Sequence, residues 1–427
     1  MKQDGAASAQ APGPPSAPRS APQPVQQPAP ATVPRHVLPV IIAAQFAGTS
    51  LWLAGNAVVD DLRLHYGLPD AALGGLTSAV QLGFIVGTLL YAVASIADRF
   101  SPSKVFLVSA LLGAACNVAI VAGPDWAGDV GLSDYTGILL LRFATGFFLA
   151  GIYPVGMKIA SDWYAAGLGK ALGFLVGALV LGTAFPHLVR ASAGELSWQA
   201  VLIATSAIAA LGGLAVSWFV PDGPYRKPGV GFRPGAIVAA FGVPRFRSAA
   251  MGYFGHMWEL YGFWAFVPLA LATRMANAAG ETVSLAAFVV IAMGSLGCVV
   301  GGFTAMRVGS ASVASVMMVV SGVLCLASPL VFALPLPLFL ALVCLWGFAV
   351  VGDSPQFSTL VARYAVPELR GSALTIVNSI GFAITIPSIQ LLTTLSGRMP
   401  VPWIYLALAI GPVLGWMAMR PLVGEGA

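Results

Sequence analysis

Long apolar stretches follow one another along most of the chain, separated by short polar segments. An α-helix of roughly 20 apolar residues crosses the hydrocarbon core of a bilayer, which is about 30 Å thick. Twelve stretches have about this length: 37–59, 71–97, 105–124, 135–157, 171–189, 196–220, 248–273, 282–306, 308–332, 338–362, 371–397 and 401–419. The pattern predicts an all-α integral membrane protein with twelve transmembrane helices.

Basic residues concentrate in every second loop between these spans. With a cytoplasmic N-terminus, sixteen of the 21 Lys and Arg residues lie on the cytoplasmic side, and one, Arg142, lies within a span. Only Arg63, Arg190, Arg274 and Arg398 lie outside. Because cytoplasmic loops are enriched in Lys and Arg, both termini are expected in the cytoplasm. We expect the protein in a plasma membrane, namely the inner membrane of a bacterium.

The composition narrows the function classes. Charged residues make up 9% of the chain, against about 25% in soluble domains, which excludes a water-soluble fold. The net charge of +5 is divided among short loops, so no nucleic-acid partner is expected. The sequence has no Gly-x-x-x-x-Gly-Lys-Ser/Thr loop, so nothing indicates ATP hydrolysis. We expect neither enzymatic activity nor a cofactor, and no metal site, because the cysteines lack ligand spacing.

Segment composition predicts the domain organisation. Residues 1–36 are rich in Pro, Ala, Gln and Ser, which is typical of a disordered cytoplasmic tail; partner binding through its prolines stays open. A six-helix bundle follows over 37–220, then a basic cytoplasmic linker over 221–247. A second six-helix bundle spans 248–420, and 421–427 forms a short cytoplasmic tail.

The two halves share helix-breaking residues at one offset. A shift of 201 residues places Gly151 on Gly352, Pro154 on Pro355 and Pro186 on Pro387. Internal repeats of this kind are common in transporters, with the substrate site between the repeats. The repeat predicts two related halves and discontinuous helices in spans 4, 5, 10 and 11, because Pro removes a helix hydrogen bond.

Two loops at equivalent places carry a degenerate motif. Between spans 2 and 3 the chain reads Ala-Ser-Ile-Ala-Asp-Arg-Phe-Ser-Pro-Ser-Lys over 94–104, and between spans 8 and 9 it reads Gly-Phe-Thr-Ala-Met-Arg-Val-Gly over 302–309. They resemble the signature loop of the major facilitator superfamily, with Ala94 and Ser101 in place of glycines and Met306 in place of the acidic residue. The resemblance implies that Asp98, Arg99, Lys104 and Arg307 form a gating loop that joins the halves in one access state. The alternative is loop charge that only fixes topology.

The fourth span resembles a second family motif. Arg142 is followed four residues later by Gly146, a pair common in proton-coupled members, although Thr145 stands where Gln is usual. The glycine pattern of exporters is only partly present in span 5, so symport and antiport both stay open. The resemblance covers about residues 37–420. It implies that spans 1, 4, 7 and 10 line a central cavity for a small molecule, and we expect a monomer in contact with membrane lipid.

Three charged residues lie within predicted spans, where charge is costly and usually functional. They are Arg142 in span 4, Glu259 in span 7 and Asp353 in span 10. Arg142 is expected to hold an anionic substrate or to tune Glu259. Glu259, with His256 one turn away, is the predicted proton carrier, and Asp353 is expected near the inner gate. A structural Glu259 bonded to a neighbouring helix is the alternative.

Polar and aromatic side chains complete the predicted site. Span 1 carries Gln45, Thr49, Trp52 and Asn56 on one face, and we add Trp258 of span 7 and Asn378 of span 11. Such side chains either line a cavity or join helices. Together these patterns predict a secondary active transporter that is proton-coupled and works by alternating access. The alternative is a transporter-fold receptor or assembly factor without transport activity.

Overall fold

A computed structural model describes residues 33–164, 168–192, 197–226, 235, 240–366 and 370–424. The regular structure of these ranges is entirely helical. Most of the predicted tail over 1–36, part of the 221–247 linker and the last three residues lie outside the described residues.

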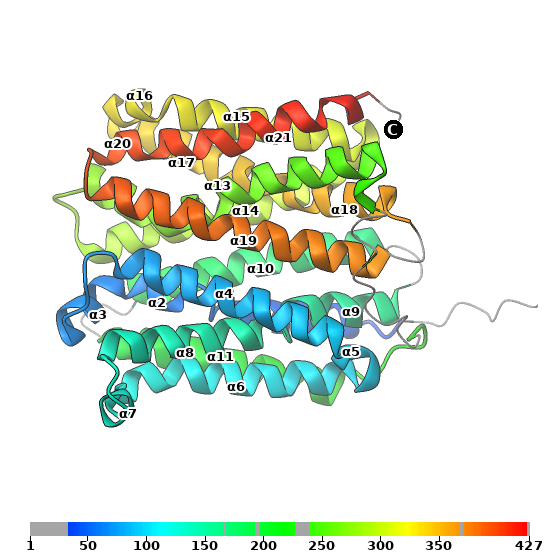
Figure 1. Ribbon diagram of the computed structural model, residues 1–427, viewed down its shortest axis with the longest axis horizontal. Helices are drawn as coiled ribbons and strands as arrows, with labels where there is room; N and C mark the ends of the chain where they lie inside the picture. The colour runs from blue at the N-terminus through cyan, green and yellow to red at the C-terminus, as the bar shows by residue number, and fades with distance from the viewer. Residues whose placement is uncertain are drawn as a thin grey trace, which may run out of the picture. The chain divides into compact units, whose positions relative to one another are not determined.

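The first half runs from span 1 to span 6. Its helices are α1 (Val37–Thr49), α2 (Ala54–Ala57), α3 (Val59–Tyr66), α4 (Ala72–Val93), α5 (Ile96–Arg99), α6 (Pro102–Ala122), α7 (Asp125–Asp129), α8 (Asp134–Leu149), α9 (Tyr153–Trp163), α10 (Leu168–Ser192) and α11 (Trp198–Phe219). The short helices α3 and α7 lie at one end of the bundle, and α5 lies at the other (Figure 1). We call these the α3 end and the α5 end.

The second half runs from span 7 to span 12. Its elements are α13 (Pro244–Arg274), α14 (Gly280–Val308), α15 (Ser310–Leu326), α16 (Ser328–Ala333), α17 (Leu336–Gly352), α18 (Ser354–Tyr364), α19 (Arg370–Ser396), α20 (Val401–Ile404), the 3₁₀ turns η2 (Tyr405–Ala409) and η3 (Arg420–Leu422), and α21 (Ile410–Met419).

The helices account for the twelve predicted spans. Among the described residues, nine helices or joined helix pairs are long and apolar enough to cross a membrane, and α1 and α15 are shorter apolar helices. The remaining span is α13, whose 31 residues include His256 and Glu259. The twelve-helix prediction is therefore confirmed.

Spans 4 and 10 break at equivalent places, as the repeat predicts. α8 ends at Leu149 and α9 begins at Tyr153, while α17 ends at Gly352 and α18 begins at Ser354. The prediction was wrong for spans 5 and 11, because α10 and α19 continue through Pro186 and Pro387. A proline removes one backbone bond, and in lipid a wider break would leave further polar groups unsatisfied, which favours a continuous helix.

The halves meet along two helix pairs. α10 packs along α14, and α4 packs along α19. Small residues permit the close approach: a Cβ on Gly177 would lie 3.0 Å from Ser295 Oγ, and a Cβ on Gly74 would lie 3.0 Å from Thr393 Cβ. Gln390 of α19 also donates to Ser78 Oγ at 2.8 Å and to the Gly74 carbonyl at 3.1 Å. Spans 2 and 11 are thus held together at the α3 end.

Candidate functional site

A cavity of about 560 Å³ opens between the two halves at the α3 end. The first half contributes α2, α3 and α10 to its wall, and the second half contributes α13, α14 and α19. Its lining includes Asn56, Asp60, Asp61, Arg63, Asp70, His187 and Arg190 from the first half, and Ala265, Phe266, Leu269, Val283, Thr393 and Ser396 from the second. The first half therefore supplies most of the polar wall, and the second half supplies an apolar one.

The charges at the cavity mouth pair with one another. Arg63 lies 3.6 Å from Asp60 and also forms an ion pair with Asp70. Arg190 lies 3.0 Å from Asp61. Each of the three carboxylates thus has an arginine partner, which lowers the charge that an entering molecule meets.

An aromatic cluster joins the halves farther from the α3 end. The Trp52 ring lies 4.8 Å from Phe84 in the first half, and 5.6 Å from both Tyr261 and Phe382 in the second. Phe84 and Phe382 are 4.5 Å apart. We call these four residues the aromatic plug. Because both halves contribute rings, the plug lies across the interface between the halves.

Arg142 holds a break in span 1. α1 ends at Thr49, and α2 begins only at Ala54. The fully buried guanidinium donates to the Leu51 carbonyl at 3.1 Å, to Asn117 Oδ1 at 3.2 Å and to the Trp52 carbonyl. The Leu51 and Trp52 carbonyls lie in the break between α1 and α2, outside either helix, and a buried carbonyl without a donor is costly. Arg142 satisfies both acceptors and thereby fixes the backbone of Trp52.

Glu259 lies in a different environment. It is 2% exposed, and its Oε1 accepts hydrogen bonds from Trp346 Nε1 at 2.9 Å, from Cys325 Sγ at 3.5 Å and from Ser321 Oγ. These donors lie on α15 and α17. In the part of the chain that the structure describes, Arg142 and Glu259 form no ion pair, so the structure does not bring the two predicted partners together.

His256 and Asp353 form a buried pair in the second half. His256 Nδ1 lies 2.8 Å from Asp353 Oδ1, and both side chains are at most 3% exposed. Asp353 occupies the break between α17 and α18, so the discontinuity that the repeat predicts for span 10 falls at this residue. His256 Nε2 has no hydrogen-bond partner among the described residues.

The remaining predicted site residues lie in different environments. Trp258 Nε1 donates to the Ala407 carbonyl at 2.9 Å, so this indole packs against span 12. Asn378 is half-buried in α19. Gln45 is fully buried, and neither amide atom has a partner among the described residues. The glycine face of span 7 accommodates a helix, because a Cβ on Gly255 would meet the backbone of α21.

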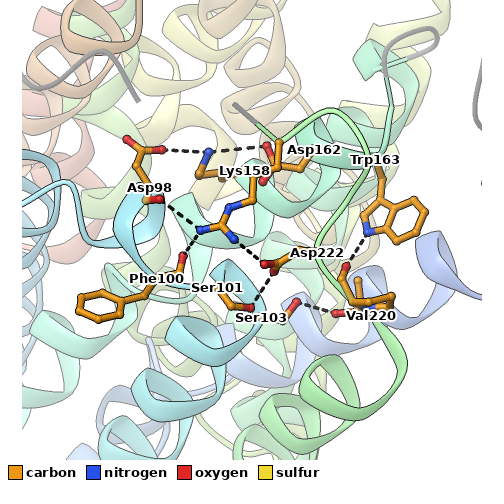
Figure 2. A network of polar contacts seen from close by, with 11 residues as sticks. Asp98, Phe100, Ser101, Ser103, Lys158, Asp162, Trp163, Val220 and Asp222 are labelled. Carbon is orange, nitrogen blue, oxygen red and sulfur yellow. Dashed lines mark hydrogen bonds and ion pairs between the residues drawn. The ribbon is translucent and has the colours of Figure 1, made fainter. Parts of the chain in front are cut away.

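The Asp98 loop forms its contacts within the first half. Lys158 of α9 lies between two carboxylates, 3.0 Å from Asp98 and 3.6 Å from Asp162 (Figure 2). Arg226, at the start of the linker, donates to the Phe100 carbonyl at 2.7 Å and to the Asp98 carbonyl at 3.1 Å. The loop therefore binds α9, the second helix of span 4, and the linker start in this conformation.

Two further contacts hold the linker start, one to the Asp98 loop and one to α9. Ser101 Oγ donates to Asp222 at 2.7 Å, and Trp163 Nε1 donates to the Pro221 carbonyl at 3.0 Å (Figure 2). The other predicted gating residues, Arg99, Lys104 and Arg307, are exposed and form no ion pair within the described ranges.

Sequence reasoning did not assign several residues that the structure brings to these sites. Thr77 and Gln81 of α4 bond Asn56 and Trp52, and Ser321 bonds Glu259. The only feature of the sequence that could have identified Thr77, Gln81 and Ser321 is a polar side chain within an apolar span. The partner of each depends on tertiary packing, which spacing along one helix does not reveal.

Known proteins confirm the family resemblance. Residues 40–387 match the family model of the Major Facilitator Superfamily. The nucleoside transporter NupG has a TM-score of 0.67 and 16% identity, and the alignment covers 90% of this chain and 99% of that chain. No curated protein matched the sequence.

A bacterial homologue of the human lysosomal transporter Spinster is similar in two conformations. Its inward-facing, unoccupied structure has a TM-score of 0.66 at 15% identity, covering 90% of this chain and 96% of that chain. Its inward-facing, occupied structure has a TM-score of 0.62 at 15% identity, covering 90% and 95%. With a family model that matches most of its length and transporters as structural neighbours, this multi-pass membrane protein belongs to the Major Facilitator Superfamily of transporters.

Proposed function

We propose that the protein is a proton-coupled secondary transporter that moves a small molecule by alternating access. The observation that carries the proposal is a cavity lined by both halves at the α3 end, together with an aromatic plug to which both halves contribute. Rocking of one half against the other would separate the plug and close the cavity, as expected for two repeats around a shared site.

The loop charges support an orientation for this cycle. Arg99, Lys104, Lys158, Arg226 and Arg307 belong to loops or helix ends on the α5 side, whereas the α3 end carries Arg63 and Arg190 among paired acids. By the positive-inside rule, the α5 end faces the cytoplasm and the cavity opens to the outside. We place the protein in a bacterial inner membrane as a monomer.

Proton coupling is assigned to the second half. α13 carries Glu259 and His256, the plug residue Tyr261 and the cavity-wall residue Phe266 within three turns. Buried carboxylates in a membrane are characteristic of proton relays. A change of charge at Glu259 or at the His256–Asp353 pair would change how α13 packs against its neighbours. Because α13 also contributes Tyr261 to the plug and Phe266 to the cavity wall, both would respond.

A proton-flux screen tests this function. Purified protein is reconstituted into liposomes that contain the pH dye pyranine, and compounds of a metabolite library are added one at a time. We expect at least one compound to drive protein-dependent proton movement. Compounds that bind the protein without moving protons or being accumulated would contradict the proposal and favour the receptor alternative.

A further inference from the structure

Two side-chain hydrogen bonds join the end of span 1 to span 2. Trp52 Nε1 donates to Gln81 Oε1 at 3.1 Å, and Asn56 Nδ2 donates to Thr77 Oγ1 at 2.7 Å. The two residues on each segment are four apart in sequence, so the two bonds form successive rungs between antiparallel segments. We call these four residues the polar ladder.

The neighbours of Asn56 fix the orientation of its amide. Thr77 Oγ1 donates its single proton to the Leu73 carbonyl at 2.7 Å, so it can only accept from Asn56. The amide nitrogen of Asn56 must therefore face Thr77, which leaves Oδ1 as the unpaired atom. The free atom at this rung is a hydrogen-bond acceptor.

The same reasoning gives the opposite result at the second rung. The indole N–H of Trp52 is a donor only, so it requires the Oε1 of Gln81 and leaves Nε2 unpaired. Gln81 is fully buried, and Asn56 is 6% exposed. The ladder thus offers one free acceptor and, one helical turn farther from the α3 end, one free donor.

The outer rung belongs to the cavity at the α3 end. Asn56 lines this cavity, and so does His187 of α10, whose Nε2 also lacks a partner among the described residues. α2 and α10 pack against each other, which places both residues on the same side of the cavity. The opposite wall includes the apolar side chains of Phe266, Leu269 and Val283.

The charges at the cavity mouth disfavour an anion. Asp60, Asp61 and Asp70 are paired with Arg63 and Arg190, so the three carboxylates exceed the two guanidiniums by one negative charge. A buried acceptor such as Asn56 Oδ1 demands a donor from its ligand, because an unpaired polar atom is costly away from water. An apolar wall opposite it suits a flat or apolar face on the same ligand.

We propose that the polar ladder is the recognition site for an uncharged small molecule that carries an N–H or O–H donor, a neighbouring acceptor and an apolar face. The donor binds Asn56 Oδ1, and the acceptor reaches Gln81 Nε2 as the molecule moves inward. This inference rests on the proposed function, because it treats the cavity ligand as the transported substrate.

Three probes that share one phenyl ring test the hydrogen-bond pattern. Benzamide is neutral with a donor and an acceptor, N,N-dimethylbenzamide keeps only the acceptor, and benzoate is an anion. Binding is measured from the thermal stabilisation of the purified full-length protein. We expect benzamide to bind at least about tenfold more tightly than either of the other probes, as for loss of one buried hydrogen bond.

Variants locate the site. Asn56→Ala should lose this tenfold preference, whereas Asn277→Ala, the same change at an exposed loop residue, should keep it. Equal affinities for the three probes, no benzamide binding up to its solubility limit, or full preference in a folded Asn56→Ala protein would each overturn the proposal. If Asn56→Ala does not fold, the wild-type comparison of the three probes decides.

The outcomes separate this site from the transport proposal. Selective benzamide binding without substrate-driven proton flux for any compound would support the ladder and contradict transport. Proton flux driven by other compounds, with no preference for benzamide over its dimethyl analogue, would support transport and overturn the ladder.

Discussion

Arg142→Ala is expected to lower the free energy of unfolding by at least about 2 kcal/mol and to abolish transport. The change leaves the Leu51 and Trp52 carbonyls and Asn117 Oδ1 without their donor. Each buried unsatisfied acceptor costs about 1–3 kcal/mol, and relief from burying a cation offsets only part of the total. The freed Trp52 backbone should also displace the Trp52 ring from the aromatic plug.

The Arg142→Lys variant tests whether position 142 requires the donor geometry of a guanidinium or only a positive charge. A guanidinium reaches three acceptors with a planar array of donors, whereas an ammonium places its donors on one nitrogen. We expect Arg142→Lys to insert and fold but to lose most transport. Arg398→Ala is the control, because it removes one charge at an exposed position that belongs to none of the predicted sites.

The measurements are thermal stability in detergent and initial transport rates at matched expression. Near-wild-type rates for Arg142→Lys over a range of pH would show that position 142 needs only positive charge. If the Arg142→Ala protein were as stable as wild type, Arg142 would not stabilise the break in span 1.

Glu259→Gln is expected to reduce proton-coupled transport at least about tenfold while the protein stays folded. Gln can still accept hydrogen bonds from Ser321 and Trp346 through its carbonyl oxygen, so the change in stability should stay below about 1 kcal/mol. It cannot exchange a proton, however. Substrate exchange without a pH gradient should persist, because it requires no net proton movement.

Two companion variants make the Glu259 result specific. Glu281→Gln, at an exposed position in the first turn of α14, should transport like wild type. Asp353→Asn tests the buried His256–Asp353 pair. Full pH-driven transport by Glu259→Gln together with its loss in Asp353→Asn would move the proton site to that pair.

Sequence patterns predicted the fold where its determinants are local. Apolar length identified twelve spans, and the breaks in spans 4 and 10 follow from Gly151 and Pro154 and from Gly352 and Pro355. The break in span 1 has no such signal, because residues 50–53 contain neither Gly nor Pro. A guanidinium 90 residues along the chain from Trp52 stabilises it.

The sequence identified which residues belong to the candidate site, but it did not identify the groups that they contact. Arg142, Glu259 and Asp353 were identified because charge in an apolar span is costly. Their partners come from packing: backbone carbonyls for Arg142, an indole for Glu259 and an imidazole for Asp353. Asp98 likewise pairs with Lys158, 60 residues away, which no loop motif specifies.

A reversible bond between the halves tests alternating access most directly. A Cβ on Gly74 would lie 3.0 Å from Thr393 Cβ, which is shorter than the separation of about 3.5–4.5 Å in a disulfide, so the bond forms once the two helices move slightly apart. Gly74→Cys with Thr393→Cys is introduced into a protein whose four native cysteines are replaced, and proton flux is measured with the compound most active in the screen. The account predicts that the oxidised protein loses at least about 90% of transport, a tenfold effect, and regains it on reduction, while either single variant is unaffected by oxidant. Full transport by protein shown to carry the disulfide would contradict relative movement of the halves at the α3 end.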